Sequence, residues 1–237
     1  MRVLALDSTT RAGSVALVED DRIVEERSGD RSRTHAERLP MELLALVDAH
    51  ELALGDVDLY AVASGPGSFT GLRIGIATVQ GLALVHGRRI VAVPALEALA
   101  LAASVAAAPG TLIAVWMDAH RRDVFAAAYR VRAAAPFSAA RLEEVDSPRV
   151  DAPAALLDRW GAVLPAAPAI FVGDGAELFD GGIRRGMPRA CIVPAPLVAG
   201  TIGRMAVARA SDAVHPAAVR PLYIRRPDAE IARDARP

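Results

Sequence analysis

Residues 65–86 have the sequence GPGSFTGLRIGIATVQGLALVH, in which a glycine-rich turn leads directly into an apolar helix. A short apolar segment, 59–63, precedes the turn and predicts a buried strand. Free amides and the helix dipole at such a strand-to-helix turn attract anions. The glycine spacing is not the dinucleotide fingerprint, and the GK[ST] ending of a Walker A loop is missing. Gly65, Gly67 and Ser68 therefore predict either a phosphate loop or a tight structural turn.

The helix predicted over 71–86 is apolar around most of its circumference. A surface helix of a monomer shows one apolar stripe, whereas a helix that is apolar all round is covered on both sides. We expect it to pack on its own sheet and on a partner subunit; the alternative is a central helix buried inside one domain. The side chains expected at the partner interface are Leu72, Ile74, Gly75, Ile76, Val79 and Leu82.

Upstream of the turn, short apolar segments alternate with polar turns. They predict strands at 3–6, 14–18 and 23–27. A helix follows, because Thr34 and Glu37 have capping-box spacing and leucines recur at helical period up to residue 49. Pro40 predicts a kink or a later helix start. This helix is expected to add His35, Leu39 and Leu43 to the interface.

Asp7, Ser8 and Thr9 stand between the first two predicted strands. An aspartate at a strand end can hold hydrated Mg²⁺, and neighbouring hydroxyls and amides can meet a phosphate. The same residue types also form ordinary hairpin turns. With the glycine-rich turn, they make a weak nucleotide-binding prediction.

The rest of the chain repeats the order of strands followed by helices. Strands are predicted at 90–93, 111–117, 124–131 and 170–172, and helices at 95–107, 154–164 and 197–210. Residues 173–175 predict a sharp turn, and the tail from Arg225 is expected to be mobile. We therefore expect an α/β fold with a first lobe at 1–105, a smaller lobe at 106–194 and a C-terminal tail at 213–237, while a final helix at about 195–212 packs back on the first lobe.

Composition narrows the function. The formal net charge is -1 and aromatic residues make up 4%, which disfavours direct RNA binding as the main activity. All 27 basic residues are arginine, which excludes Schiff-base and P-loop lysine chemistry. Cys191 is the only cysteine, so an intrachain disulfide is excluded and a buried structural thiol is expected. No signal peptide or membrane helix is predicted, which makes the cytoplasm the expected location.

Catalytic constellations are missing from the sequence. No two of the five histidines have metal-ligand spacing, and no G-x-S-x-G elbow occurs. We predict neither catalytic residues nor a metal site.

Five stretches together resemble the TsaB (YeaZ) family over almost the whole chain. The glycine segment, with its GPGSFTGLRIG core, is the most specific of them. The stretches are 5–10 with 14–17, 65–81, 117–119 with 122–125, 173–175 and 221–225.

The resemblance implies an actin-like ATPase (ribonuclease H-like) fold with two related lobes. It also implies a scaffold subunit of the complex that forms N6-threonylcarbamoyladenosine at position 37 of tRNAs reading ANN codons. TsaD, the transferase, is the expected heterodimer partner, and TsaE, a small ATPase, is a further one. Without TsaD we expect a homodimer, and we expect tRNA to be contacted through the complex. No cofactor is expected on the isolated chain, although ATP or ADP with Mg²⁺ can lie at the complex interface.

The related TsaD family carries metal-binding histidines after the strand that follows the glycine-loop helix. The corresponding positions here are Ala95 and Leu99, which have no lone pair for a metal, although Glu97 persists. We therefore expect a non-catalytic relative of TsaD. The alternative is an active nucleotide-dependent transferase or kinase that uses Asp7 and the glycine loop.

Overall fold

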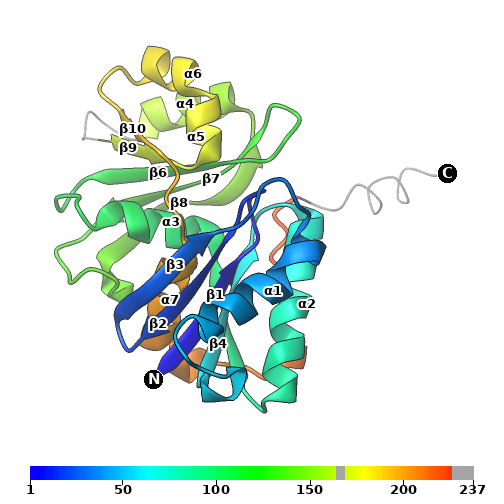
Figure 1. Cartoon of the computed structure of the whole chain (residues 1–237). Coiled ribbons are helices and arrows are strands. Elements are labelled where there is room, and N and C mark those ends of the chain that lie inside the picture. Colours follow the sequence, from blue (N-terminus) through cyan, green and yellow to red (C-terminus); the bar gives the residue numbers. More distant parts are fainter. Residues whose placement is uncertain (164–168, 226–237) are drawn as a thin grey trace.

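Two β-sheets of the same design form the centre of the computed structural model, which describes residues 1–163 and 169–225 (Figure 1). Within these residues, each sheet has five strands, and its first strand pairs antiparallel with the second and parallel with the fourth. The first sheet, in the order β3-β2-β1-β4-β5, contains β1 (Arg2–Asp7), β2 (Ser14–Glu19), β3 (Arg22–Ser28), β4 (Leu59–Gly65) and β5 (Arg89–Pro94). The second, in the order β10-β9-β6-β7-β8, contains β6 (Leu112–Asp118), β7 (Val124–Val131), β8 (Leu142–Asp151), β9 (Ala169–Val172) and β10 (Cys191–Val193). The chain is thus duplicated at the level of topology.

Helices cover the outer face of each sheet and fill the space between the sheets (Figure 1). The first sheet carries α1 (His35–Asp48) and α2 (Phe69–Val85) on its outer face. The second carries α4 (Pro153–Val163), α5 (Asp174–Leu178) and α6 (Asp180–Gly186). Two helices change lobes: α3 (Ala95–Ser104) follows the first sheet but packs mainly on the second, and α7 (Ala199–Ala208) follows the second sheet but packs on the first. The exchange ties the lobes together.

Alternation along the strands supplies the two faces that this layering needs. Along β1, Leu4 and Leu6 face α1 and α2, whereas Val3 and Ala5 face the core between the lobes. The first strand of the second sheet does the same, with Trp116 on the outer face. The outer core there includes a tilted Trp116–Trp160 pair at 5.9 Å between ring centroids.

Most predicted elements are confirmed within a few residues, and the departures have physical causes. Strand β8 was not predicted because its sequence, LEEVDSPRVD, is charged and contains Pro148, which suits an edge strand. Asp174, expected in a turn, instead begins α5. The first helix begins at His35, before Pro40, so a later start is wrong. The prediction of a buried Cys191 is also wrong, because it lies exposed on edge strand β10.

The segment before residue 226 crosses from one lobe to the other. The Leu222 amide donates to the Ser64 carbonyl at the end of β4, at 2.7 Å. The Arg225 guanidinium donates to the Ala119 carbonyl at 2.8 Å and pairs with the Asp123 carboxylate. The tail was predicted to be mobile from Arg225, but Arg225 itself is held by these contacts, and the rest of that tail lies outside the described residues. None of the helices in the described ranges is both long and apolar enough to cross a membrane.

Candidate functional site

The glycine-rich loop is packed directly on the turn between β1 and β2. The Ser68 amide donates to the Thr9 carbonyl at 3.0 Å. A Cβ atom added to Gly67 would lie 2.6 Å from the Thr9 Cβ. A Cβ atom on Gly75, eight residues further on, would lie 2.0 Å from the Ser8 Oγ. Glycine is required at both positions because the two segments are in close contact.

Asp7 is enclosed by this packing. Its side chain is only 3% exposed, and one carboxylate oxygen accepts from the Thr9 amide at 2.9 Å and from the Thr9 Oγ1 at 2.6 Å. Burial raises the pKa of Asp7 against the effect of these hydrogen bonds, and the charge of Asp174 adds to the rise. Burial likewise raises the pKa of Asp174, which accepts from the Asp118 amide at 2.9 Å. Asp7 lies in the first lobe and Asp174 in the second, and they are close enough for the charge of one to act on the other.

The structure therefore brings the predicted nucleotide-binding residues together but leaves few of them accessible. Ser8 and Thr9 are buried with Asp7, and Gly65 is covered by the Leu222 backbone. Gly67 is half-buried and Ser68 is exposed. Over residues 1–163 and 169–225, no three His, Cys, Asp or Glu side chains are grouped as metal ligands. The arrangement fits a structural turn better than a phosphate loop.

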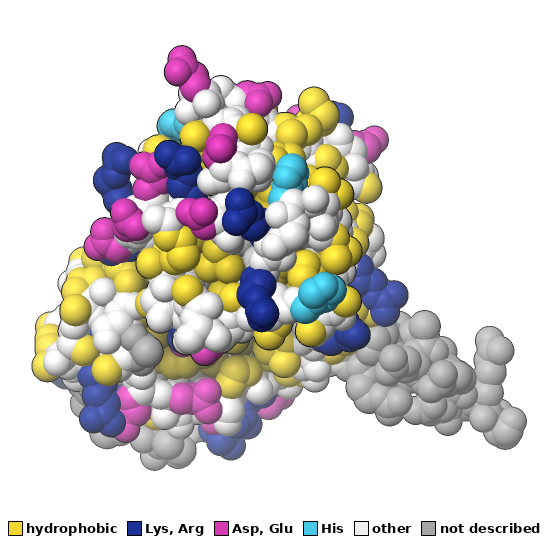
Figure 2. Space-filling model, turned by 90° about the horizontal axis from the view of Figure 1, so that it is seen from below, with side chains coloured by type: hydrophobic (Ala, Val, Ile, Leu, Met, Phe, Trp, Pro, Cys, Tyr) yellow, Lys and Arg dark blue, Asp and Glu magenta, His cyan; other side chains and the backbone are white. Residues whose placement is uncertain are grey.

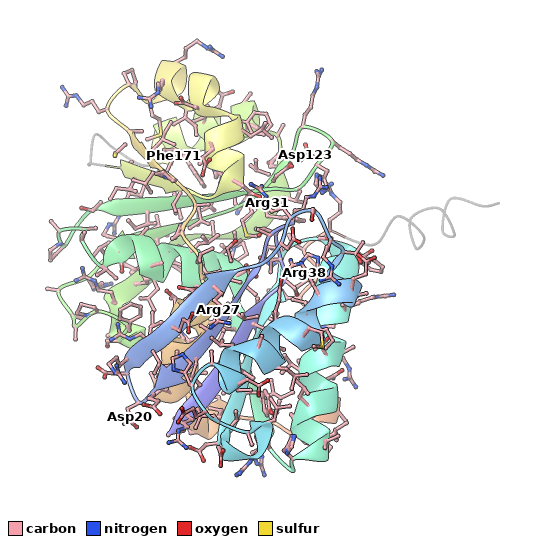
Figure 3. The ribbon with its side chains drawn as sticks, viewed as in Figure 1. Asp20, Arg27, Arg31, Arg38, Asp123 and Phe171 are labelled. Atoms are coloured by element: carbon pink, nitrogen blue, oxygen red, sulfur yellow. The ribbon has the colours of Figure 1, made fainter. Side chains whose placement is uncertain are left out.

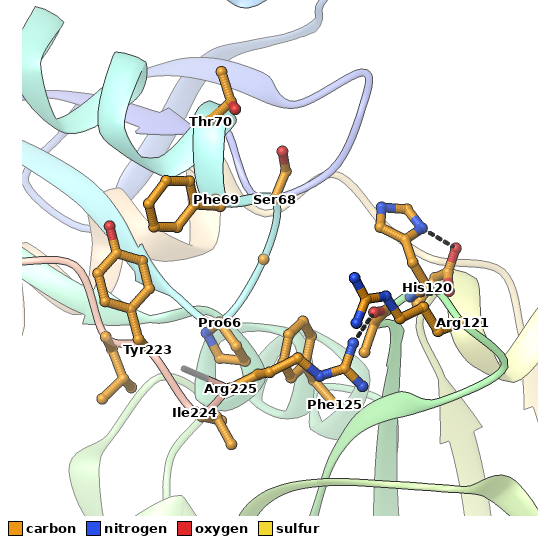
Figure 4. A pocket seen from close by; sticks show the side chains of 14 residues that line it. Pro66, Ser68, Phe69, Thr70, His120, Arg121, Phe125, Tyr223, Ile224 and Arg225 are labelled. Carbon is orange, nitrogen blue, oxygen red and sulfur yellow. Dashed lines mark hydrogen bonds and ion pairs between the residues drawn. The ribbon is translucent and has the colours of Figure 1, made fainter. Parts of the chain in front are cut away.

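A pocket of about 400 Å³ lies beside the loop, between the two lobes (Figure 4). Residues 66–70 form one wall, the β6–β7 turn forms another, and residues 222–225 close the third. The turn holds three successive non-glycine residues in the left-handed region, His120 at φ 59°, Arg121 at 55° and Arg122 at 68°. This pocket could not be predicted from sequence patterns, because its walls come from three segments that are far apart in the chain.

Helix α2 has an inner face that packs on the first sheet and an outer face that is exposed. Most of the residues predicted for the partner interface lie on the inner face. Leu72, Gly75, Ile76 and Val79 are buried in the chain's own core, as are Leu39 and Leu43 of α1. Their assignment to a partner interface is wrong, because these side chains already cover the first sheet. Each large apolar side chain buried there contributes about 1.5–3 kcal/mol to the stability of the fold. Ile74, Leu82 and His35 are half-buried.

The outer face of α2 is exposed and mostly small or apolar. Ala77 and Gly81 are exposed, Leu84 is 52% exposed and Val85 is 80% exposed. Charge enters this face only near its N-terminal end, at Arg73. Small side chains allow a second helix to approach closely, so this is a candidate docking face.

An aromatic and cationic cluster that was not predicted stands at the start of α2. Phe69 stacks on Tyr223 with ring centroids 5.2 Å apart, and the Arg73 guanidinium lies 3.9 Å from the Phe69 centroid. The Arg73 Nε donates to the Tyr223 hydroxyl at 2.9 Å. These contacts fix the C-terminal segment against α2, between the docking face and the pocket.

The positions that correspond to TsaD histidines are core positions here. Ala95 is fully buried, and Leu99 is 5% exposed. Glu97 forms two hydrogen bonds with Arg209, just after α7, one of them at 3.0 Å. Its carboxylate holds α3 to α7, which is a structural role.

Comparison with known proteins places this geometry in context. Residues 29–170 match the family model of TsaD, described as tRNA N6-adenosine threonylcarbamoyltransferase. An uncharacterized protein of Mycobacterium tuberculosis is 34% identical over 96% of this chain and 93% of its own length. A Mycobacterium leprae relative is also 34% identical, and there the match spans only 56% of the relative. The Escherichia coli tRNA threonylcarbamoyladenosine biosynthesis protein TsaB is 42% identical over 35% of this chain and 36% of its own.

Solved structures agree. YeaZ from Pseudomonas aeruginosa has a TM-score of 0.72 and 29% identity, covering 94% of this chain and 99% of that one. A polyphosphate/ATP-glucomannokinase from Arthrobacter has a TM-score of 0.51 at 13% identity, covering 89% of this chain and 99% of that one. The second likeness shows the fold alone, that of the actin-like ATPases with two related lobes.

Proposed function

The chain belongs to the TsaB (YeaZ) family, and from this premise we propose that it is the non-catalytic subunit that binds and supports a TsaD-type threonylcarbamoyltransferase. Relatives with the TsaB name are biosynthesis proteins of tRNA threonylcarbamoyladenosine. We place this chain in the same process, in the cytoplasm.

The exposed outer face of α2 is the observation that carries the proposal. A strip with Ala77, Gly81, Leu84 and Val85 exposes apolar surface to water along a helix whose other side is already buried. Covering such surface gains about 25 cal/mol per Å² before the costs of association. The partner we propose is a helix of the TsaD-type subunit. In its absence the same strip pairs with a second copy of this chain.

Ala77→Glu tests the docking face. The carboxylate would be buried without a partner at the interface, so the dissociation constant for the TsaD-type protein of the same organism should rise about 100-fold or more. Titration calorimetry gives the constant, and size-exclusion with light scattering reports loss of the homodimer.

Leu178→Glu is the matched control, because Leu178 is 61% exposed on α5 of the second lobe. It should leave both measurements unchanged. Equal effects of the two variants, or wild-type binding by Ala77→Glu, would contradict the proposed interface.

Catalysis and nucleotide binding are proposed to lie outside the isolated chain. The burial of Asp7, which limits access to its carboxylate, supports this proposal. The apolar side chains at positions 95 and 99 support it as well, because they have no lone pair for a metal. We propose that ATP or ADP with Mg²⁺, and a TsaE-type ATPase, act at the interface of the assembled complex.

A nucleotide-dependent transferase or kinase is the second candidate, and the interlobe pocket of about 400 Å³ favours it. Titration of the isolated chain with ATP and Mg²⁺ discriminates. Micromolar binding that Asp118→Ala abolishes, with Leu178→Glu as control, would promote this candidate; no heat of binding is the outcome we expect.

A further inference from the structure

A second pocket, of about 280 Å³, opens between the first turns of α1 and α2 and is lined by arginines. Arg11 comes from the β1–β2 turn, and Arg31 and Arg33 come from the loop that leads into α1. Figure 3 shows Arg31 in that loop, ahead of α1 and of Arg38. All three arginines are exposed. Arg11 is distant from Arg31 and Arg33 in the sequence, and the three side chains line one pocket only in the folded chain.

The three arginines have no carboxylate within ion-pairing distance in the described part of the chain. Two of them donate to backbone carbonyls instead: the Arg11 Nε to that of Arg31 at 3.3 Å, and an Arg33 Nη to that of Glu37 at 2.9 Å. The nearest acids are held locally, Asp30 by the amide and hydroxyl of Ser32 and Glu37 by those of Thr34. The pocket wall itself contains no acidic side chain.

The charge of this pocket differs from that of the chain as a whole and of the face seen from below. Over the whole sequence the formal net charge is -1. On the face seen from below, basic and acidic side chains are interspersed with hydrophobic ones (Figure 2). The pocket between α1 and α2 concentrates one sign of charge instead, which attracts anions to it.

A buried arginine braces this pocket. Arg38 is 1% exposed, pairs with Glu42 at 2.5 Å, and donates to the carbonyls of Arg11 and Ala12. It thereby fixes the turn that bears Arg11 against the start of α1. The remaining lining adds hydroxyl donors from Ser68 and Thr70 at the first turn of α2. Guanidinium groups with hydroxyls and helix-start amides form the donor set that proteins use for phosphate.

We propose that this pocket binds phosphate groups of the tRNA backbone, so that this subunit contacts the substrate of the complex directly. The inference rests on the proposed function for its choice of tRNA. Apart from His35, the pocket is lined by no ring on which a base could stack, which favours a backbone phosphate over a free nucleotide. Its lining on α2 ends at Ile74, so it does not include the exposed residues of the strip at 77–85.

The test is Arg31→Ala combined with Arg33→Ala, in the complex with the TsaD-type protein. Filter binding of tRNA over a salt series should show at least a tenfold loss of affinity. The slope of log K against log salt should fall by about 0.7–0.9 for each phosphate contact removed. Arg184→Ala with Arg185→Ala, on α6, removes the same charge and should leave the slope unchanged.

Three results would overturn the proposal. One is an equal loss in the α6 pair, which would assign the effect to net charge. Another is a joint loss of tRNA and of the TsaD-type partner, measured separately by calorimetry, which would assign the arginines to the protein interface. The third is arginine-dependent binding of ATP or inorganic phosphate with unchanged tRNA affinity. If the chain binds no TsaD-type protein at all, the proposed function fails, and the same salt series on the chain alone still tests the pocket.

Discussion

The two lobes share a strand order but use the same topological positions differently. In the first lobe the turn after the first strand is buried under the glycine loop, and Asp7 is enclosed. In the second lobe the corresponding turn, after β6, stands exposed and lines the interlobe pocket. The helix that follows the fourth strand has 17 residues in the first lobe and 5 in the second. At this position in the topology, within the described residues, the long helix and its exposed outer face belong to the first lobe.

This difference indicates that the shared strand order sets the positions at which a site can form, while the local packing determines whether such a position is buried or open to a ligand. The buried turn of the first lobe has become part of the core that supports α2. The open turn of the second lobe remains available to a ligand or a partner. Each of the following substitutions compares one lobe with the other.

The largest expected effect is that of Gly75→Ala in the first lobe. The added Cβ would collide with the Ser8 side chain, so the free energy of unfolding should fall by about 3 kcal/mol. Gly161→Ala in α4 of the second lobe is the control, because no atom lies within 4 Å of its added Cβ. It should raise the free energy of unfolding by about 0.5–1 kcal/mol. Urea denaturation measures both, and similar effects would refute close packing of the turn.

A smaller effect, of opposite sign in the two lobes, is expected for two buried carboxylates. Burial alone raises the pKa of Asp146, but hydrogen bonds from Arg159 and Trp160 and nearby guanidinium charges outweigh it, so the pKa lies below its ordinary value. The pKa of Asp7 is raised. At pH 7, Asp146→Asn should lower the free energy of unfolding by about 2 kcal/mol, and Asp7→Asn should raise it.

The two carboxylates should make stability depend on pH in opposite directions. A lowered pKa means that the stabilisation by Asp146 is present above the ordinary carboxyl pKa and is lost as pH falls through the folded-state value. The raised pKa of Asp7 means that its charge costs stability at neutral pH, and that this cost disappears as pH falls. Denaturation between pH 3 and pH 7, in steps of about one unit, should therefore show both variants converging on the wild type from opposite sides. Deviation of both in the same direction would show that the two environments do not differ as described.

Sequence patterns were sufficient to locate the strands and helices, but they could not tell which side of helix α2 is buried and which is exposed. Alternation and turn residues located most strands, because each strand has one side toward α1 and α2 or their counterparts and one toward the central core. The burial of Leu72 and Ile76 and the exposure of Ala77 and Leu84 could not be separated in this way, since all four are apolar. The pockets were equally out of reach, because Arg11, the loop before α1 and residues 222–225 meet only in the folded chain.

The smallest expected effect concerns the turn backbones themselves. The β1–β2 turn places glycine, Gly13, at its positive φ of 60°, whereas the β6–β7 turn holds Arg122 at 68°. A non-glycine residue in this region costs about 1–2 kcal/mol, so Arg122→Gly should raise the free energy of unfolding by about 0.5–1 kcal/mol after the larger entropy loss of glycine is subtracted. Gly13→Ala should lower the free energy of unfolding, and by a larger amount, because its Cβ would lie 2.4 Å from the Asp7 carbonyl oxygen. If Arg122→Gly is instead destabilising, the arginine side chain contributes more than its backbone costs, and the open turn of the second lobe is maintained by contacts rather than at the expense of stability.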